Sequence, residues 1–116
     1  MGHAIKRVYE PVSDQDGYRI LVDRLWPRGL SKERAAVDLW LRTIAPSTGL
    51  RRWFGHDPGK WNEFRSKYSD ELAAHAREIA QIRALAKRRR VTLVYGARDN
   101  EHNDAVALLY YLESHP

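Results

Sequence analysis

The stretch DRLWPRG at 23–29 places charge and aromatic surface in one turn, directly after an apolar run. Arg24 and Arg28 carry forked guanidinium donors that suit a phosphate or a carboxylate. Trp26 offers a ring that can stack on a base, and Asp23 can orient an arginine, hold a metal or act as a base. We therefore predict an anion site in which Arg24, Trp26 and Arg28 bind ligand and Asp23 is catalytic. The alternative is structural, with Arg24 paired to an acidic neighbour and Trp26 filling the core.

The stretch RRWFGHDP at 51–58 offers a second set of such groups. His56 lies just before an expected helix start, where backbone N–H groups and the helix dipole favour an anion. A neutral histidine can also move a proton there. These features predict Arg52 as a ligand-binding residue and His56 as a catalytic acid or base. In the alternative, Asp57 caps the helix and His56 satisfies a backbone group.

A third polar stretch, GARDNEHNDA at 96–105, follows the last apolar run of the chain. It repeats the arrangement of the first stretch, a strand end followed by a helix start. We predict Arg98, His102 and Asn103 as ligand-binding residues and Asp99 as a catalytic residue, although His102 and Asn103 also suit plain capping. If the first and third stretches follow parallel neighbouring strands, four side chains converge. They are Arg28, His56, Arg98 and Asn103.

Metal ligation is the weaker interpretation of these side chains. His56, Asp99 and His102 could supply ligands, and the last two are three residues apart, which one helical turn tolerates. No HExxH or similar pattern supports such a site, so we predict no metal.

The elements that must position these groups follow from apolar periodicity. Strands are expected at 4–10, 18–26 and 91–97, an extended segment at 37–44, and helices at 31–36, 48–55, 58–89 and 99–114. One helix over 58–89 would be about 48 Å long at 1.5 Å per residue, so we expect a break near His75. Ser31, Ser47 and Asp57 suit helix starts. The order of elements predicts an α/β fold with helices packed on a small, mostly parallel sheet.

Bulk composition limits the classes of protein that fit. The 116 residues, 43% of them hydrophobic, suit one domain over 1–116 with a real core. The absence of cysteine excludes disulfides and thiolate catalysis. The sequence shows neither a signal segment nor a run of about 18 apolar residues, so we expect a cytoplasmic protein. The net charge of +5 favours a phosphate-bearing partner.

The motifs DRLWPRG, WFGHDP and TLVYGARDNEHNDA together resemble the YeaO-like family, known as domain of unknown function 488. The resemblance runs from about residue 4 to residue 113 and implies a Rossmann-like three-layer α/β fold. The family has no established function. Gly96-Ala97 stands here in place of the family's common Ala/Ser-Ala pair.

Three functions stay open on the sequence. The leading hypothesis is a basic pocket at the strand ends that binds a phosphate-bearing small molecule, a nucleotide or nucleoside derivative, with hydrolase or transferase chemistry left open. No nucleophile and no Walker loop are present, which argues against an ATPase. The alternatives are a nucleic-acid-binding module, with KRRR at 87–90 as its densest basic run, and a protein-interaction adaptor anchored by Trp26. The cofactor and the oligomeric state are unknown.

Overall fold

A four-stranded, all-parallel sheet forms the centre of the computed structural model, which describes residues 3–115. The strands are β1 (His3–Arg7), β2 (Tyr18–Leu21), β3 (Leu39–Trp40) and β4 (Val91–Tyr95), in the order β1-β4-β2-β3. The last strand of the sequence therefore lies between the first two. As a result, the carboxyl ends of β2 and β4 are direct neighbours.

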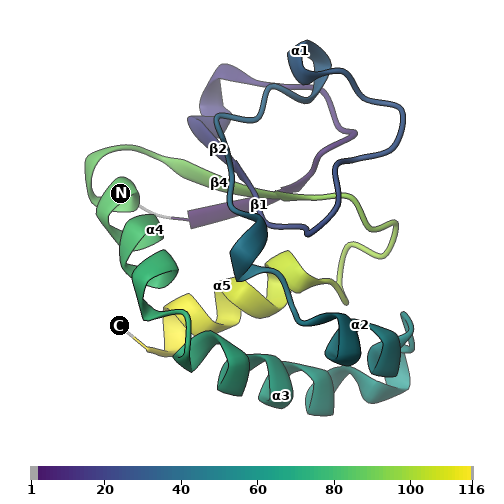
Figure 1. Ribbon diagram of the computed structural model, residues 1–116. Helices are drawn as coiled ribbons and strands as arrows, with labels where there is room; N and C mark the ends of the chain where they lie inside the picture. The colour runs from purple at the N-terminus through teal and green to yellow at the C-terminus, as the bar shows by residue number, and fades with distance from the viewer. Residues whose placement is uncertain (1–2, 116) are drawn as a thin grey trace.

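Helices cover one face of the sheet, and a short helical turn with its flanking loops covers the other (Figure 1). The helices are α1 (Lys32–Ala35), α2 (Thr48–Phe54), α3 (Trp61–Ala73), α4 (Ala76–Arg88) and α5 (Asp104–Ser114). Helices α4 and α5 contact β4 directly, and α3 packs against α5, whereas α1 lies on the opposite side. This is the predicted α/β class, with the three-layer, Rossmann-like arrangement that the motifs implied.

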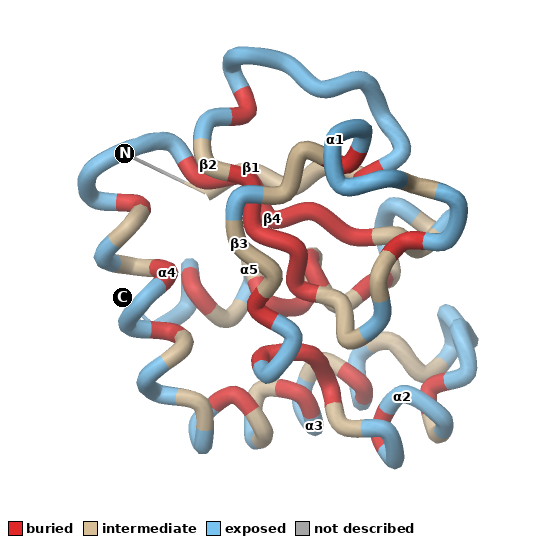
Figure 2. The backbone as a smooth tube through the Cα atoms, turned by 45° about the horizontal axis from the view of Figure 1, so that its top comes forward, coloured by how far each residue is buried: buried red, intermediate tan, exposed pale blue. Residues whose placement is uncertain are grey.

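Alternate residues of the strands serve two separate apolar clusters, as the pleat of a strand requires. On the helix side, Ile20 and Leu93 belong to the large core with the buried residues of α2 to α5. On the other side, Leu21 and Val94 pack with Val8 beneath α1. Figure 2 shows β4 as a continuous buried segment, which is typical of a strand covered on both faces.

The strands end earlier than the sequence predicted. The strand predicted over 18–26 ends at Leu21, and the one predicted over 91–97 ends at Tyr95. The carboxylate of Asp23 accepts the N–H of Gly96 at 2.8 Å, so a side chain replaces the next backbone bond between the two strands. The first strand is also shorter than predicted, and ends at Arg7.

Three further segments test the predicted element boundaries. The extended segment predicted over 37–44 pairs only at Leu39–Trp40, and a 3-10 turn follows. The helix predicted over 99–114 starts at Asp104, because the side chain of Asp99 accepts two N–H groups and makes a separate turn. The predicted break near His75 is confirmed, since α3 ends at Ala73 and α4 begins at Ala76.

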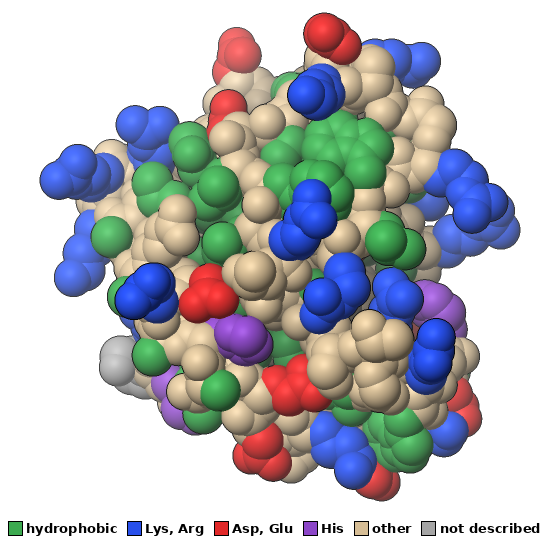
Figure 3. All heavy atoms as spheres, in the orientation of Figure 1, with side chains coloured by type: hydrophobic (Ala, Val, Ile, Leu, Met, Phe, Trp, Pro, Cys, Tyr) green, Lys and Arg blue, Asp and Glu red, His purple; other side chains and the backbone are tan. Residues whose placement is uncertain are grey.

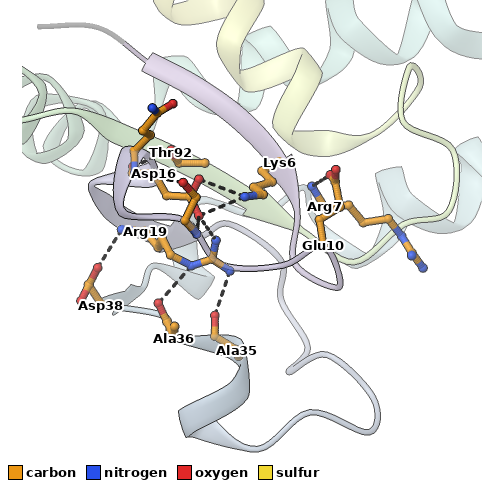
Figure 4. A network of polar contacts seen from close by, with 11 residues as sticks. Lys6, Arg7, Glu10, Asp16, Arg19, Ala35, Ala36, Asp38 and Thr92 are labelled. Carbon is orange, nitrogen blue, oxygen red and sulfur yellow. Dashed lines mark hydrogen bonds and ion pairs between the residues drawn. The ribbon is translucent and has the colours of Figure 1, made fainter.

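A buried ionic network lies on the second face of the sheet, the face that α1 and its flanking loops cover, and it links these loops to the strands (Figure 4). Arg19, only 2% exposed, donates to Asp16 at 2.8 Å and to the carbonyl oxygens of Ala35 and Ala36 at the end of α1. Lys6 donates to the same Asp16 at 3.1 Å. Burial alone would raise the pKa of Asp16. The N–H of Ser13 and the two cationic partners outweigh burial and hold that pKa below its ordinary value.

Candidate functional site

A cavity of about 190 Å³ opens beside the carboxyl ends of β2 and β4. Helix α2 and the segment from β4 to the start of α5, which lie on the same side of the molecule in Figures 1 and 2, supply much of its wall. Residues 45–46 and Phe64 of α3 complete it. Phe54 and Phe64 line its apolar part. Its polar side chains are Asp23, Arg24, Arg51, His56, His102, Asn103 and Asp104.

The cavity gathers half of the residues that the sequence singled out. Those in its lining are Asp23, Arg24, His56, His102 and Asn103. Those outside its lining are Trp26, Arg28, Arg52, Arg98 and Asp99. Of the four side chains expected to converge, His56 and Asn103 therefore share the cavity, whereas Arg28 and Arg98 are exposed elsewhere on their loops.

Trp26 and Arg28 lie outside because the DRLWPRG turn folds over the second face of the sheet. The Trp26 ring packs edge-on against Trp40 at a centroid distance of 5.4 Å, and its Nε1 donates to the carbonyl oxygen of Leu30 at 2.8 Å. The Arg28 side chain is exposed, and its carbonyl oxygen accepts from the hydroxyl of Tyr9 at 2.7 Å. In this conformation Trp26 fills the small second core, which was the structural alternative.

Asp23 and Asp104 form a close carboxyl pair in the cavity wall. Asp23 accepts the Gly96 N–H, and Asp104 accepts the N–H of Ala105 at 2.9 Å. Burial raises the pKa of Asp104 well above its ordinary value, and the charge of Asp23 and the hydrogen bond between the two groups raise it further. A Cβ atom at position 96 would lie 3.2 Å from the Asp23 oxygen, so a larger residue there would require the Asp23 side chain to move by a few tenths of an ångström.

Sequence reasoning missed Asp104 and did not select Arg51. The only local signal for Asp104 was an acidic residue in the first turn of a helix, which ordinarily reports a favourable dipole interaction rather than a site. Arg51 belonged to the RRWFGHDP stretch, but nothing in its spacing distinguished it from Arg52. Only the orientation of α2 places Arg51, and not Arg52, in the cavity lining.

The two arginines of the cavity keep much of their donor capacity. Within residues 3–115, neither Arg24 nor Arg51 lies within 4.0 Å of a carboxylate oxygen. Arg24 donates one hydrogen bond, at 3.2 Å, to the carbonyl oxygen of Pro46, and its buried Nε has no partner in the described part of the chain. Arg51 is exposed. Both guanidinium groups therefore remain available to an anionic ligand.

The two histidines of the cavity are held in different ways. His56 is exposed and follows Gly55, and both residues adopt the left-handed conformation, at φ 57° and 54°. A non-glycine residue in that region is uncommon, although histidine is among those that tolerate it. His102 contacts Asp99 through Nδ1 at 2.9 Å and meets the ring of Trp61 edge-on. The N–H of Glu101 and the His102 side chain lower the pKa of Asp99.

Other features of the chain bear on the remaining classes of site. No group of three or more His, Cys, Asp or Glu side chains in residues 3–115 is arranged to hold a metal ion. Among the helices that the structure describes, none has both the length and the apolar character needed to cross a membrane.

Comparison with known proteins places the chain among uncharacterised relatives. Residues 3–115 match the family model DUF488-N3i, described as "Inactive DUF488-N3 subclade". The uncharacterised protein YeaO of Escherichia coli K12 is 45% identical over 109 residues, which cover 94% of this chain and 95% of YeaO. The uncharacterised protein Rv3073c of Mycobacterium tuberculosis H37Rv is 40% identical over 108 residues, 93% of this chain and 91% of that protein. No solved structure matches the chain significantly.

Proposed function

The chain belongs to the DUF488 family, and we propose that its cavity binds a small phosphate-bearing molecule at the carboxyl ends of β2 and β4. One observation carries this proposal. Two guanidinium groups, Arg24 and Arg51, line the cavity without a carboxylate partner in the described part of the chain. Such groups suit a phosphate, and open α/β sheets bind ligands outside the carboxyl ends of their strands.

Binding without turnover is the form of this proposal that the observations favour. Ser47 follows the cavity residue Pro46 and could be considered as a nucleophile. Its hydroxyl, however, donates to Glu71 at 2.5 Å and caps α2, so it already has a structural role. The Ser31 hydroxyl likewise caps α1. The family description calls the subclade inactive, which agrees with a pocket that holds a ligand and does not convert it.

Nucleic acid fits the surface less well than a small ligand fits the cavity. The basic residues 87–90 are exposed around the end of α4 and do not line the cavity. Lys and Arg side chains are spread over much of the face in Figure 3, including both of its edges. The rings of Trp26 and Trp53 are already engaged, by Trp40 and by the ammonium groups of two lysines. These contacts leave little free aromatic surface for stacking on bases.

Thermal unfolding with a ligand panel tests the proposal. The panel contains sugar phosphates, nucleotides, polyphosphate and oligonucleotides at low and high salt. A compound that binds only the folded state adds about 2.7 kcal/mol to the free energy of unfolding at a hundredfold excess over its Kd. We expect a small phosphate compound to do so at both salt concentrations, and Arg51→Ala to abolish the effect.

Arg52→Ala is the matched control, because Arg52 is the next residue of α2, is also exposed and lies outside the cavity lining. It should keep the stabilisation that Arg51→Ala loses. Equal losses in the two variants would show that general positive charge, rather than the cavity, attracts the ligand. Stabilisation by oligonucleotides alone, lost in high salt, would refute the proposal in favour of nucleic-acid binding.

A further inference from the structure

The carboxyl pair of the cavity lacks a neutralising cation. Within residues 3–115, no lysine, arginine or histidine nitrogen lies within 4.0 Å of Asp23 or Asp104. Each group accepts one backbone N–H, from Gly96 and from Ala105 respectively. Apart from the hydrogen bond between the two carboxyls, no side chain in the described residues donates to either group.

Ionising both members of such a pair costs stability, since like charges repel and burial removes water from them. A ligand that donates hydrogen bonds to the remaining acceptor positions of the two carboxyls would offset this cost. The buried acid on the other face of the sheet, Asp16, differs in this respect, because Lys6 and Arg19 both pair with it. Clefts that collect unneutralised acids of this kind are candidate binding sites.

The same cavity therefore offers a ligand both carboxyl groups that accept hydrogen bonds and guanidinium groups that donate them. Asp23 and Asp104 lie where β2 ends and α5 begins, and they accept hydrogen bonds. Arg51, from α2, and Arg24 donate hydrogen bonds and carry positive charge. A ligand that matches both must carry donors on one part and an anionic group on another.

The size of the cavity restricts the ligand further. Its volume, about 190 Å³, lies below the roughly 300–1,000 Å³ of pockets that enclose drug-sized molecules. A phosphorylated sugar ring is of this scale, whereas a dinucleotide is not.

We infer that the ligand is a phosphorylated pentose with vicinal hydroxyl groups, which donate to Asp23 and Asp104 while the phosphate lies against Arg24 and Arg51. This inference rests on the proposed function and specifies its ligand. The pentose phosphate is either free or the sugar of a mononucleotide, since both present the same hydroxyl and phosphate groups. The phenylalanines of the cavity, Phe54 and Phe64, contact the apolar face of the ring.

Titration calorimetry on the whole chain tests this inference with four probes. They are ribose 5-phosphate, 2-deoxyribose 5-phosphate, inorganic phosphate and phosphoethanolamine. We expect ribose 5-phosphate to bind most tightly, and the deoxy compound to bind about tenfold more weakly, because it lacks one hydroxyl that donates to a charged group. Adenosine 5'-monophosphate identifies the source: tighter binding than ribose 5-phosphate indicates a mononucleotide, and weaker binding a free sugar phosphate.

Variants then separate the carboxyl pair from the rest of the cavity. Asp104→Asn and Asp23→Asn should each remove the preference for ribose over deoxyribose while inorganic phosphate binds as before. Glu101→Gln is the control, since Glu101 is exposed on the same loop and does not line the cavity. It should leave the preference unchanged. Circular dichroism checks that each variant is folded, and the two Asp variants provide independent readings.

Four results would overturn the inference. Equal affinity for the ribose and deoxyribose compounds would show that the hydroxyl is not recognised. Tighter binding of phosphoethanolamine would assign the carboxyl pair to an amine. An unchanged preference in both Asp variants would place the hydroxyl contacts elsewhere. In these three cases binding that is still lost in Arg51→Ala would leave the proposed phosphate site standing, whereas no binding of any phosphate compound would remove both.

Discussion

At the scale of single residues, one side chain has a structural role and also lines the cavity. Asp23 was expected to orient an arginine, hold a metal or act as a base. In the structure it accepts the Gly96 N–H, which ends the pairing of β2 with β4, and it also faces the cavity beside Asp104. Because the same carboxylate fixes the loop and presents charge, removing it should alter both the position of residue 96 and the chemistry of the cavity.

Asp104→Asn should stabilise the protein at neutral pH. The folded state raises the pKa of Asp104, so it binds this proton more tightly than the unfolded chain does. The wild-type chain therefore loses stability as pH rises from the ordinary aspartate value through the raised one. The variant carries no such titration. Urea unfolding between pH 3 and pH 8 should show similar free energies of unfolding for the two proteins at the acid end. As pH rises, the free energy of unfolding of the variant should exceed that of the wild type by a growing margin.

Asp70→Asn provides the comparison, because Asp70 is exposed on α3 and outside the cavity. Its unfolding free energy should stay within about 0.5 kcal/mol of the wild type at every pH. An Asp104→Asn variant whose stability runs parallel to the wild type over this range would contradict the raised pKa.

At the scale of elements, two capping residues compete for the start of α5, and the structure shows which one succeeds. Asp99 makes its own turn by accepting the N–H groups of Glu101 and His102, and the helix then starts five residues later with Asn103 as N-cap. Asn103 is 4% exposed, and its side chain accepts from Val106 and donates to the carbonyl oxygen of Asp99. The later start places Asp104 in the cavity.

Asn103→Ala should lower the free energy of unfolding by about 1 kcal/mol, the usual effect of removing an N-cap. Because the cap also positions Asp104, we expect weaker ligand binding as well. Calorimetry and urea unfolding measure the two effects separately.

Ser31→Ala removes the equivalent cap of α1, which lies away from the cavity. It should reduce stability and leave binding intact. If both cap variants bound ligand like the wild type, Asn103 would be a structural residue alone.

At the scale of the whole molecule, the sheet order and the two differently covered faces create the site. The carboxyl ends of β2 and β4 meet only because β4 inserts between β1 and β2. The helices on one face then leave a cavity at this end, while the network of Lys6, Asp16 and Arg19 closes the other face.

Arg19→Met should reduce the free energy of unfolding by about 3–5 kcal/mol, because it leaves a buried carboxylate and two carbonyl oxygens without this partner. Urea unfolding at pH 7 measures the loss. Below the unfolding transition the variant should still bind the ligand, since Arg19 lies outside the cavity lining.

Arg88→Ala is the control for the loss of one positive charge. Arg88 is exposed in the last turn of α4, so its removal should cost at most about 1 kcal/mol. A loss of that small size in Arg19→Met would mean that the network contributes little to folding.

The sequence by itself determined the α/β class, the existence and approximate place of the main strands, the break between α3 and α4, and several helix starts. Ser31, Ser47 and Asp57 are N-caps as predicted. These features depend on apolar periodicity and on hydrogen bonds between residues close in the chain, so short stretches contain the information. The family, too, was evident from its motifs, and the comparisons confirm it.

Only the tertiary structure decided the composition of the cavity. It brought Asp104 to Asp23, selected Arg51 over its neighbour, and turned Trp26 into the second core. Each of these outcomes depends on which strands become neighbours and on how each helix rotates against the sheet. Those are properties of packing between distant segments, and no local pattern of residue types encodes them.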